Sequence, residues 1–348
     1  MPPLPTPDLE HVLRHTGSLW DDLRGKRIFL TGGTGFVGTW LLESLLHAND
    51  RLDLGVSVVM LTRDADRYCK KSPHLAEHAA LHLLQGDLTN FEWPDGSFPV
   101  VIHAATAEWH AADAYRPLGT FDTDIVGTRR VLDFARTHGV ERLLFTSSGA
   151  VYGKQPPHVS HMAEDHAGAP STTDPGSAYG QAKRISEYMC CMYGQVYGFN
   201  AMIARLFAFV GPCLPLDANF AIGNFIRDAM SGGPVRVSGD GTPFRSYLYA
   251  ADLAIWLWTI ILRGRIAYPY NVGSQAALTI EDLARAVIAA IAPSVPALIA
   301  VRPTSNEPAP RYVPDVRRAE QELGLRPLIP LDEAVRRTAA WHAATSSL

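Results

Sequence analysis

The sequence predicts an α/β fold in which helices cover a doubly wound parallel sheet. Short apolar runs alternate with longer amphipathic stretches through residues 28–148, as strands and helices do in such a fold. A glycine-rich turn joins the first apolar run to the first amphipathic stretch. The 348 residues, of which 47% are hydrophobic, are enough for one large domain or for one domain with a smaller lobe.

Five apolar runs have the length and composition of buried parallel strands. They are expected at residues 28–30, 56–61, 81–84, 100–105 and from residue 142, with helices at residues 8–23, 40–46, 122–138, 179–197 and 253–262. The N-terminal helix precedes the first strand, with Asp8 as its N-cap. Trp20 and Leu23 are expected to dock it on the domain or on another subunit.

Charge and cysteine content limit the function classes. The net charge is −4 and no long basic run occurs, so the sequence has no electrostatic signature of nucleic-acid binding. The four cysteines form no C-x-x-C pair, which argues against a disulfide framework or a zinc site, and no metal is expected. The N-terminus does not resemble a signal peptide, and residues 253–262 are too few to cross a membrane. We expect a cytoplasmic protein with reduced thiols.

The glycine-rich turn carries the first sign of chemistry. Gly32, Gly35 and Gly38 have G-x-x-G-x-x-G spacing. Glycines permit a tight turn and a close approach of the backbone to a pyrophosphate, and the following helix offers free N–H groups and its positive dipole end. The alternative is a tight turn without a ligand. In the dinucleotide interpretation, the contacts in the turn are Gly32, Thr34, Gly35, Phe36 and Val37.

The ends of the next strands are expected to contact the rest of the dinucleotide. Arg63 follows the second strand, where the adenosine ribose is met, and it favours NADP(H) over NAD because a guanidinium pairs with a 2′-phosphate. Asp64 is the alternative contact, through the ribose hydroxyl of NAD, and Arg63 would then stack on adenine or lie in solvent. Asp87 is either an acceptor for the adenine amino group or a turn residue. The remaining expected contacts are Leu88, Ala104 and Ala105.

A serine, a tyrosine and a lysine form a candidate proton relay. Ser148 ends the fifth strand, and Tyr179 and Lys183 are four residues apart, so on a helix they share a face. A nearby ammonium lowers the pKa of a tyrosine, which can then exchange a proton with an alcohol hydroxyl near neutral pH. The serine can hydrogen-bond the same oxygen, and a nicotinamide can take the hydride. An isolated Tyr-x-x-x-Lys is otherwise typical of a half-buried tyrosine beside a surface lysine.

Together these motifs resemble an extended short-chain dehydrogenase/reductase of the NAD-dependent epimerase/dehydratase family, whose members act on nucleotide sugars. The resemblance extends from Lys26 to about Trp341 and rests on TGGTGFVG, GDLT, IHAA, SSGAVYG, YGQAK, ARLF and VSGDGTPFRSYLYAADLA. It implies a Rossmann fold. It also implies that Ser148 is the serine of the catalytic set, that Tyr179 is the acid/base, and that Lys183 assists Tyr179 and holds the nicotinamide ribose.

The resemblance further implies a domain division and a substrate site. Residues 1–24 form an arm, residues 25–200 the NAD(P)-binding domain, and residues 201–345 mainly a substrate-binding lobe, with segments near 201–210 and 247–273 returning to the sheet. The lobe is expected to hold a nucleoside-diphosphate sugar. Guanidinium groups suit a diphosphate, although each arginine is otherwise a solvated ion pair. The expected substrate contacts are Asn219, Arg236, Arg245 and Arg311.

Departures from the family pattern narrow the expected activity. Gly149 and Ala150 stand where 4,6-dehydratases of the family carry an acidic pair, and UDP-glucuronate decarboxylases carry a glutamate at position 150. Both activities are therefore less well supported. Asp124 and Ala208 stand where asparagines are usual. We expect a C4 epimerase of a nucleotide sugar. The alternatives are an NADPH-dependent 4-keto-sugar reductase and, from another class, a dinucleotide-binding sensor without catalysis.

The resemblance also bears on assembly. Many relatives dimerise through two helices of each subunit, and the corresponding residues here are 122–138 and 179–197. The second of these helices is rich in Tyr188, Met189, Met192 and Tyr193, which suits an apolar contact between helices. We therefore expect a homodimer.

Overall fold

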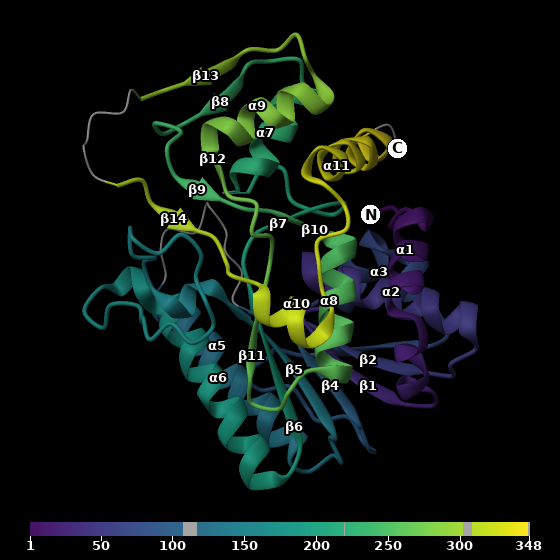
Figure 1. Ribbon diagram of the computed structural model, residues 1–348. Coiled ribbons are helices and arrows are strands. Elements are labelled where there is room, and N and C mark those ends of the chain that lie inside the picture. The colour runs from purple at the N-terminus through teal and green to yellow at the C-terminus, as the bar shows by residue number, and fades with distance from the viewer. Residues whose placement is uncertain (107–116, 219, 302–307, 347–348) are drawn as a thin grey trace.

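A seven-stranded parallel sheet is the centre of the molecule (Figure 1). The computed structural model describes residues 1–106, 117–218, 220–301 and 308–346. The strand order is β11-β6-β5-β4-β1-β2-β3, so the chain runs outward from β1 in one direction and then from β4 in the other. The strands are β1 (Arg27–Thr31), β2 (Ser57–Thr62), β3 (Leu81–Gln85), β4 (Val100–His103), β5 (Arg142–Ser148), β6 (Asn200–Leu206) and β11 (Pro269–Val272). This doubly wound order confirms the predicted fold class.

Helices cover both faces of the sheet because each strand is apolar on both sides. In β1, Ile28 and Leu30 belong to one core and Phe29 to the other, as the alternation of side chains along a strand requires. The first core is closed by α1 (Thr6–Thr16), α2 (Phe36–Leu52) and α8 (Ala250–Arg263). The second core is closed by α5 (Pro117–Ala135) and α6 (Ala178–Tyr197). The short helices α3 (Ala65–Lys71) and α4 (Pro73–Ala76) connect β2 to β3.

A smaller lobe lies above the carboxyl ends of the strands (Figure 1). Its helices are α7 (Ala221–Met230), α9 (Ile280–Ile291) and α11 (Leu331–Ser346), and its strands include β8 (Val235–Val237) and β13 (Ala297–Ile299). Between the lobe and the sheet lies a three-stranded sheet of β12 (Leu278–Thr279), β9 (Phe244–Arg245) and β14 (Arg311–Tyr312). The remaining elements are β7 (Phe209–Val210), β10 (Leu248–Tyr249) and α10 (Arg317–Leu323). The chain returns to the large sheet through β6, α8 and β11, so the two parts are interwoven.

The N-terminal arm differs from the prediction. A single helix was expected over residues 8–23, whereas α1 ends at Thr16 and a 3-10 helix follows over Gly17–Leu23. Trp20 and Leu23 are buried, as expected. Asp8 is not the N-cap, a position that Pro5 occupies. Asp8 is buried and accepts hydrogen bonds from the Tyr249 hydroxyl and the Arg337 guanidinium, 2.5 and 2.6 Å away.

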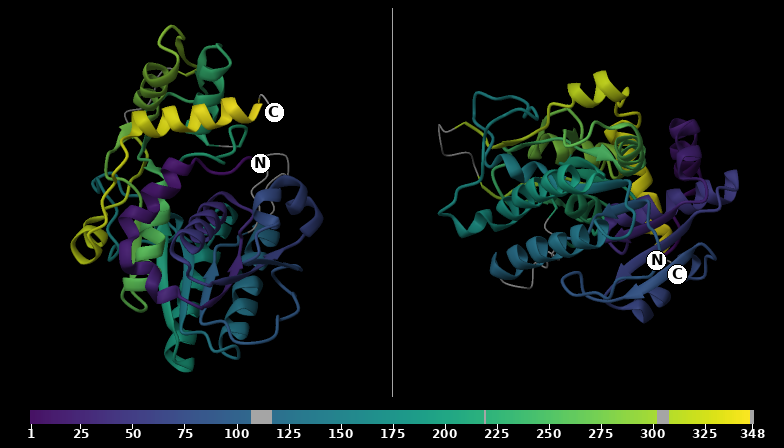
Figure 2. Two further views of the ribbon diagram at one scale, coloured as in Figure 1. Left: turned by 90° about the vertical axis from the view of Figure 1, so that its right-hand side faces the viewer. Right: turned by 90° about the horizontal axis from the view of Figure 1, so that it is seen from below.

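The ends of the described chain lie close together (Figure 2). The Trp341 indole donates a hydrogen bond to the carbonyl of Pro3, so α11 and the start of the arm are in contact. Across the described ranges, every helix is too short or too polar to cross a membrane. The four cysteines are free thiols.

Candidate active site

Ser148, Tyr179 and Lys183 meet at the carboxyl end of the large sheet. Ser148 is the last residue of β5, and Tyr179 and Lys183 lie in the first two turns of α6, which packs against β5. The Ser148 hydroxyl is near enough to Tyr179 to lower the pKa of its phenol. The Lys183 ammonium donates to the Thr146 carbonyl at 3.3 Å and lies 5.8 Å from the centroid of the Tyr179 ring. The structure therefore brings together the three residues of the expected relay.

Burial controls the protonation of this set. Burial raises the pKa of Tyr179 to about 12, whereas the hydrogen bond from Ser148 lowers it and the charge of Asp124 raises it further. Burial lowers the pKa of Lys183, and Asp124 opposes that shift. A nearby ammonium was expected to lower the pKa of Tyr179. In the protein alone, burial is the largest influence on this group and raises its pKa.

A buried histidine joins the three elements around the site. His103, at the end of β4, contacts the Thr31 hydroxyl through Nδ1 at 2.8 Å and the Thr128 hydroxyl of α5 through Nε2 at 3.0 Å. Ser186 of α6 donates to the same Thr128 hydroxyl at 3.1 Å. Burial lowers the pKa of His103 to about 3, so this imidazole is neutral at physiological pH. The neutral imidazole therefore links β1 to α5 directly, and it is linked to α6 through the Thr128 hydroxyl.

The glycine turn fits a dinucleotide. A Cβ on Gly32 would lie 2.4 Å from the carbonyl carbon of Ala104, and one on Gly38 would lie 2.1 Å from the Gly32 oxygen, so internal packing explains both glycines. A Cβ on Gly35 would meet only the Gly32 oxygen, at 3.5 Å, which is an ordinary contact. Gly35 is also the N-cap of α2, and no side chain caps this helix. The position is thus open on the outside and presents helix N–H groups, as a pyrophosphate site requires.

The other turn residues lie around this opening. Thr34 is exposed, and Phe36 and Val37 are half-buried in the first turn of α2. The backbone N–H groups of Ala104 and Ala105 donate to Thr31 at 3.1 and 3.3 Å, which holds the end of β4 against the turn.

The residues expected at the adenosine end divide into two kinds. Asp64 accepts from the backbone N–H of Arg67 at 2.8 Å and is therefore the N-cap of α3. Asp87 accepts from the N–H and hydroxyl of Thr89, which is the turn role that the sequence left open. These hydrogen bonds, with a smaller contribution from Arg63, lower the pKa of Asp87. Arg63 is exposed at the end of β2 and lies near Asp87, and Leu88 is buried.

The substrate arginines are not equivalent. Arg245 pairs with Tyr312, and Phe244 pairs with Arg311, in the parallel register of β9 and β14. Neighbouring residues of a strand point to opposite faces, so Arg245 and Tyr312 share one face and Arg311 lies on the other. The Arg245 guanidinium lies 5.9 Å from the centroid of the Tyr312 ring, whereas that of Arg311 stacks 3.9 Å from the centroid of the Phe244 ring.

One further substrate position, Arg236, is not brought to this sheet. Arg236 is exposed in the middle of β8, which pairs with β13 in the upper lobe. Its backbone N–H donates to Asp228 at 3.2 Å. Asn219 lies outside the described residues.

Tyr312 is a site residue that sequence reasoning did not identify. Its hydroxyl lies 3.5 Å from the Ser148 hydroxyl, and its ring packs against Phe207 with centroids 4.7 Å apart. A Cβ on Gly149 would lie 2.8 Å from the Tyr312 hydroxyl and 2.7 Å from the Phe207 ring. Tyr312 and Phe207 thus fill the space that a side chain at position 149 would need. The only sequence signal was its position next to Arg311, since nothing in the spacing links it to Ser148.

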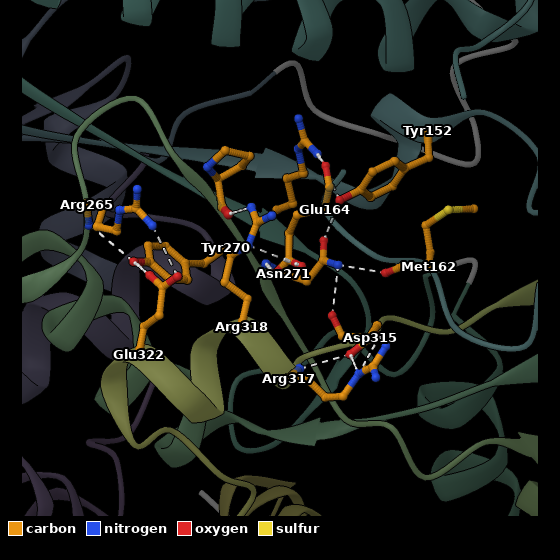
Figure 3. Close-up of polar contacts among 12 residues, drawn as sticks. Tyr152, Met162, Glu164, Arg265, Tyr270, Asn271, Asp315, Arg317, Arg318 and Glu322 are labelled. Carbon is orange, nitrogen blue, oxygen red and sulfur yellow. Dashed lines mark hydrogen bonds and ion pairs between the residues drawn. The ribbon is translucent and has the colours of Figure 1, made fainter. Parts of the chain in front are cut away.

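The buried amide of Asn271 links the loop that follows Ser148 to the segment that follows Tyr312, through Tyr152 and Asp315 (Figure 3). Asn271 of β11 accepts from the Tyr152 hydroxyl at 2.7 Å, four residues after Ser148. Its side-chain amide donates to the carbonyls of Met162 and Asp315 at 2.7 and 3.0 Å, and its backbone N–H donates to Glu164 at 2.9 Å. Asp315 follows Tyr312 by three residues. One side chain therefore ties together the segments on both sides of the site.

Comparison with known proteins gives a family. A model of the NAD dependent epimerase/dehydratase family matches residues 28–273. UDP-glucuronic acid decarboxylase 6 of Arabidopsis thaliana is 29% identical over 334 residues, which are 96% of this chain and 91% of the relative.

Solved structures give the same architecture. UDP-glucose 4-epimerase of Thermotoga maritima, solved with UDP-glucose, is 20% identical with a TM-score of 0.75, over 92% of this chain and 99% of that one. A solved UDP-galactose 4-epimerase is 26% identical with a TM-score of 0.71 over the same shares of the two chains. In the described part of this chain, no group of three or more His, Cys, Asp or Glu side chains is arranged to hold a metal ion.

Proposed function

Because the chain belongs to the NAD dependent epimerase/dehydratase family, we propose that it is an epimerase that inverts C4 of a nucleoside-diphosphate sugar. Members of the family are NAD(P)-dependent enzymes that modify nucleotide sugars, and this chain is such an enzyme of the extended short-chain dehydrogenase/reductase type. The observation that carries the finer proposal is the meeting of Ser148, Tyr179 and buried Lys183 beside two positions, Gly149 and Ala150, that bear no carboxyl group.

The relay acts on a hydroxyl of the sugar. Tyr179, as the phenolate, takes the hydroxyl proton while the Ser148 hydroxyl holds the same oxygen by a hydrogen bond. Lys183 supplies the positive charge that stabilises the phenolate. A nicotinamide dinucleotide held at the glycine turn and by Lys183 would supply the hydride acceptor for the sugar carbon and the hydride donor for its return. Rotation of the resulting ketone between these two transfers inverts the carbon, and Tyr179 then returns the proton.

The region next to Ser148 supports inversion rather than elimination or decarboxylation. The resemblance places acidic residues of dehydratases at positions 149 and 150 and a glutamate of decarboxylases at position 150. Here Gly149 is packed against the Phe207 ring and the Tyr312 hydroxyl. A carboxyl side chain does not fit at position 149 without movement of both. The 29% identity to UDP-glucuronic acid decarboxylases supports the nucleotide-sugar class, while the residues at 149 and 150 argue against that reaction.

The diphosphate is assigned to Arg245. This guanidinium is on the face of the three-stranded sheet that Tyr312 shares, and Tyr312 reaches the relay. Arg311 stacks on Phe244 on the opposite face and is a contact for a more distant part of the nucleotide. Guanidinium groups bind phosphate oxygens through paired hydrogen bonds, which suits both positions.

Exposed Arg63 favours the reductase as the second candidate. A guanidinium at the end of β2 suits the 2′-phosphate of NADPH, which a reductase consumes in each turnover. A sensor without catalysis has no need of a buried lysine beside a tyrosine, so it is the least supported of the three.

The outer face of α6 supports a homodimer. Ile185, Tyr188, Met192 and Val196 recur every three or four residues, and their exposed fractions run from 38% for Met192 to 69% for Tyr188. Such a stripe is too apolar for a free helix face. Val126 of α5 is exposed as well, and α5 and α6 pack side by side. Light scattering is expected to give twice the mass of the chain, and a monomer would contradict the proposal.

The first test of function identifies the cofactor and the reaction. The purified protein is denatured and the released dinucleotide is identified by chromatography and mass. Bound oxidised dinucleotide in stoichiometric amount is expected, because an epimerase regenerates it in every cycle. An empty site that binds NADPH well ahead of NADH would identify the reductase instead.

Three probes then distinguish the reactions. UDP-glucose, UDP-N-acetylglucosamine and UDP-glucuronic acid are incubated with the enzyme, and C4 inversion of at least one is expected. Release of CO2 from UDP-glucuronic acid, or the absence of inversion with all three, would contradict the proposal. Tyr179→Phe should retain the dinucleotide and lose roughly 10²- to 10⁴-fold in turnover, since it lacks the proton-transfer group. Undiminished turnover in this variant would show that the relay is wrong.

A further inference from the structure

Asp124 is a carboxylate in an unusual place. It lies on α5 and is 2% exposed, although ionised carboxylates are costly to bury. Both of its oxygens accept from the Thr106 hydroxyl at 3.0 Å. One of them lies 4.0 Å from the ammonium of Lys183, which is also 2% exposed. A carboxylate and an ammonium are thus buried side by side next to the relay.

The other groups around Lys183 do not balance its charge. Glu187, one turn further along α6, is bound by Arg205, whose guanidinium lies 2.7 Å away. His103 of β4 is neutral, because burial lowers its pKa to about 3. Burial raises the pKa of the Cys190 thiol of α6, so this group is uncharged as well. From β5, the Lys183 ammonium contacts the carbonyl oxygen of Thr146 and the face of the Phe145 ring, and neither group carries a charge.

We propose that Asp124 is the buried counter-ion of Lys183 and a positioning residue of the proton relay. The carboxylate keeps Lys183 as an ammonium beside Tyr179, which an asparagine at this place does not do by charge. A buried ammonium without a counter-ion would lose its proton, because taking a lone charge out of water costs several kcal/mol. The inference rests on the proposed role of Tyr179 and Lys183 and explains how a lysine this deeply buried retains the charge that the role requires.

The charge of Asp124 shifts the pKa values of Lys183 and Tyr179 in the same direction. The Asp124 charge raises the pKa of Lys183, because it stabilises the ammonium. It also raises the pKa of Tyr179, because it disfavours a second negative charge nearby. Loss of the carboxylate therefore lowers both pKa values. A purely structural role of Asp124 would leave both unchanged.

The first experiment follows the Tyr179 phenolate directly and needs neither substrate nor cofactor. Tyrosinate absorbance is titrated in the wild type and in Asp124→Asn, and the curve of the same protein carrying Tyr179→Phe is subtracted from each. A downward shift of one unit from a pKa of about 12 would raise the ionised fraction of Tyr179 at pH 11 roughly fivefold. Circular dichroism at each pH verifies that the protein remains folded. An unchanged or smaller ionised fraction would overturn the proposal.

Asp133→Asn is the matched control. Asp133 is on the same helix and accepts from the Tyr193 hydroxyl at 3.0 Å, away from the relay. The change removes the same charge with the same isosteric replacement, so no shift of the Tyr179 titration is expected. An equal shift in the two variants would show a general charge effect and would also overturn the proposal.

A second experiment covers the case in which Asp124→Asn is too unstable to titrate. Lys183→Met removes the ammonium from beside the buried carboxylate and should melt at a lower temperature than the wild type. Asp124→Asn added to Lys183→Met removes the carboxylate charge as well and should raise the melting temperature again. Additive losses from the two changes would show that the groups are not a pair. Both experiments are independent of which sugar the enzyme turns over, so their failure is distinct from failure of the proposed function.

Discussion

The two walls of the site are built differently. The sheet wall consists of Ser148, Tyr179, Lys183 and Asp124, which come from β5, α5 and α6. Ser148, Lys183 and Asp124 are buried, and Tyr179 is half-buried. The arginine wall consists of Arg245 and Arg311 on the two-residue strands β9 and β14, where both are half-buried. Burial sets the electrostatics of the first wall, while the second keeps contact with water. The chemistry thus lies in the rigid layer, and the groups that meet a polyanionic substrate lie where their desolvation costs little.

Tyr312 connects the two walls. It belongs to β14 and yet its hydroxyl reaches Ser148. The contact depends on Asn271, whose amide holds the segment after Tyr312 and the loop after Ser148 in one network (Figure 3). The comparison predicts that changes in the sheet wall and its supports alter stability, whereas changes in the arginine wall alter substrate binding.

The largest effect on stability is expected at Arg205, which supports the sheet wall. Arg205 of β6 pairs with Glu187 of α6 and donates to the Tyr152 hydroxyl at 2.8 Å and the Glu164 carbonyl at 3.0 Å. Arg205→Met leaves Glu187 as a buried charge without its partner and should lower the free energy of unfolding by about 3–5 kcal/mol, measured by urea denaturation. Glu187→Gln in the same chain removes the orphaned charge and should recover part of the loss. A loss below about 1 kcal/mol for Arg205→Met would contradict the prediction that the supports of the sheet wall control stability.

The arginine wall should show the reverse behaviour. Arg245→Gln removes a charged donor from the assigned diphosphate site and should raise KM for the active probe sugar by roughly 10- to 100-fold, the equivalent of about 1.5–3 kcal/mol. The free energy of unfolding should change by less than about 0.5 kcal/mol. Arg236→Gln, on exposed β8, is the matched control and should change KM by less. Equal increases of KM in the two variants would contradict the assignment of the diphosphate to Arg245.

The smallest effect is expected at the connection between the walls. Tyr312→Phe keeps the ring that packs on Phe207 and removes only the hydroxyl near Ser148. Because 3.5 Å is a long hydrogen bond, kcat should fall only about two- to fivefold, with KM nearly unchanged. Tyr312→Ala removes the ring as well and should cost considerably more. If the two variants were equally impaired, the hydroxyl rather than the packing would carry the role of Tyr312.

Local patterns predicted the parts of the site that are close in sequence. The glycine turn is predictable because Gly32, Gly35 and Gly38 act within one strand–turn–helix unit. Tyr179 and Lys183 are predictable because four residues on a helix always share a face. Their positions relative to Ser148 followed from the resemblance, whose fold the sheet order confirms.

Contacts between distant segments were not predictable in the same way. Tyr312 and Ser148 are 164 residues apart, and nothing in the sequence marks their contact. Asp8 has the sequence features of an N-cap, but its carboxylate is bound by Tyr249 and Arg337 from the other end of the chain. The pKa of Tyr179 depends on burial, and the degree of burial is a property of the finished fold.

The arm also has a consequence for how the chain folds as it is synthesised. Its first helix leaves the ribosome early, but His11 is bound by Asp252 at 3.2 Å, 241 residues later, and Asp8 by Arg337, 329 residues later. At ordinary translation rates of about 5–20 residues per second, α1 waits roughly 15–70 seconds for its last partner. The helix α1 therefore makes these contacts only after the later helices have been synthesised. Until α8 and α11 have emerged, α1 can pack only on nearby elements such as α2, and the rest of its apolar face is exposed to chaperones and to neighbouring nascent chains.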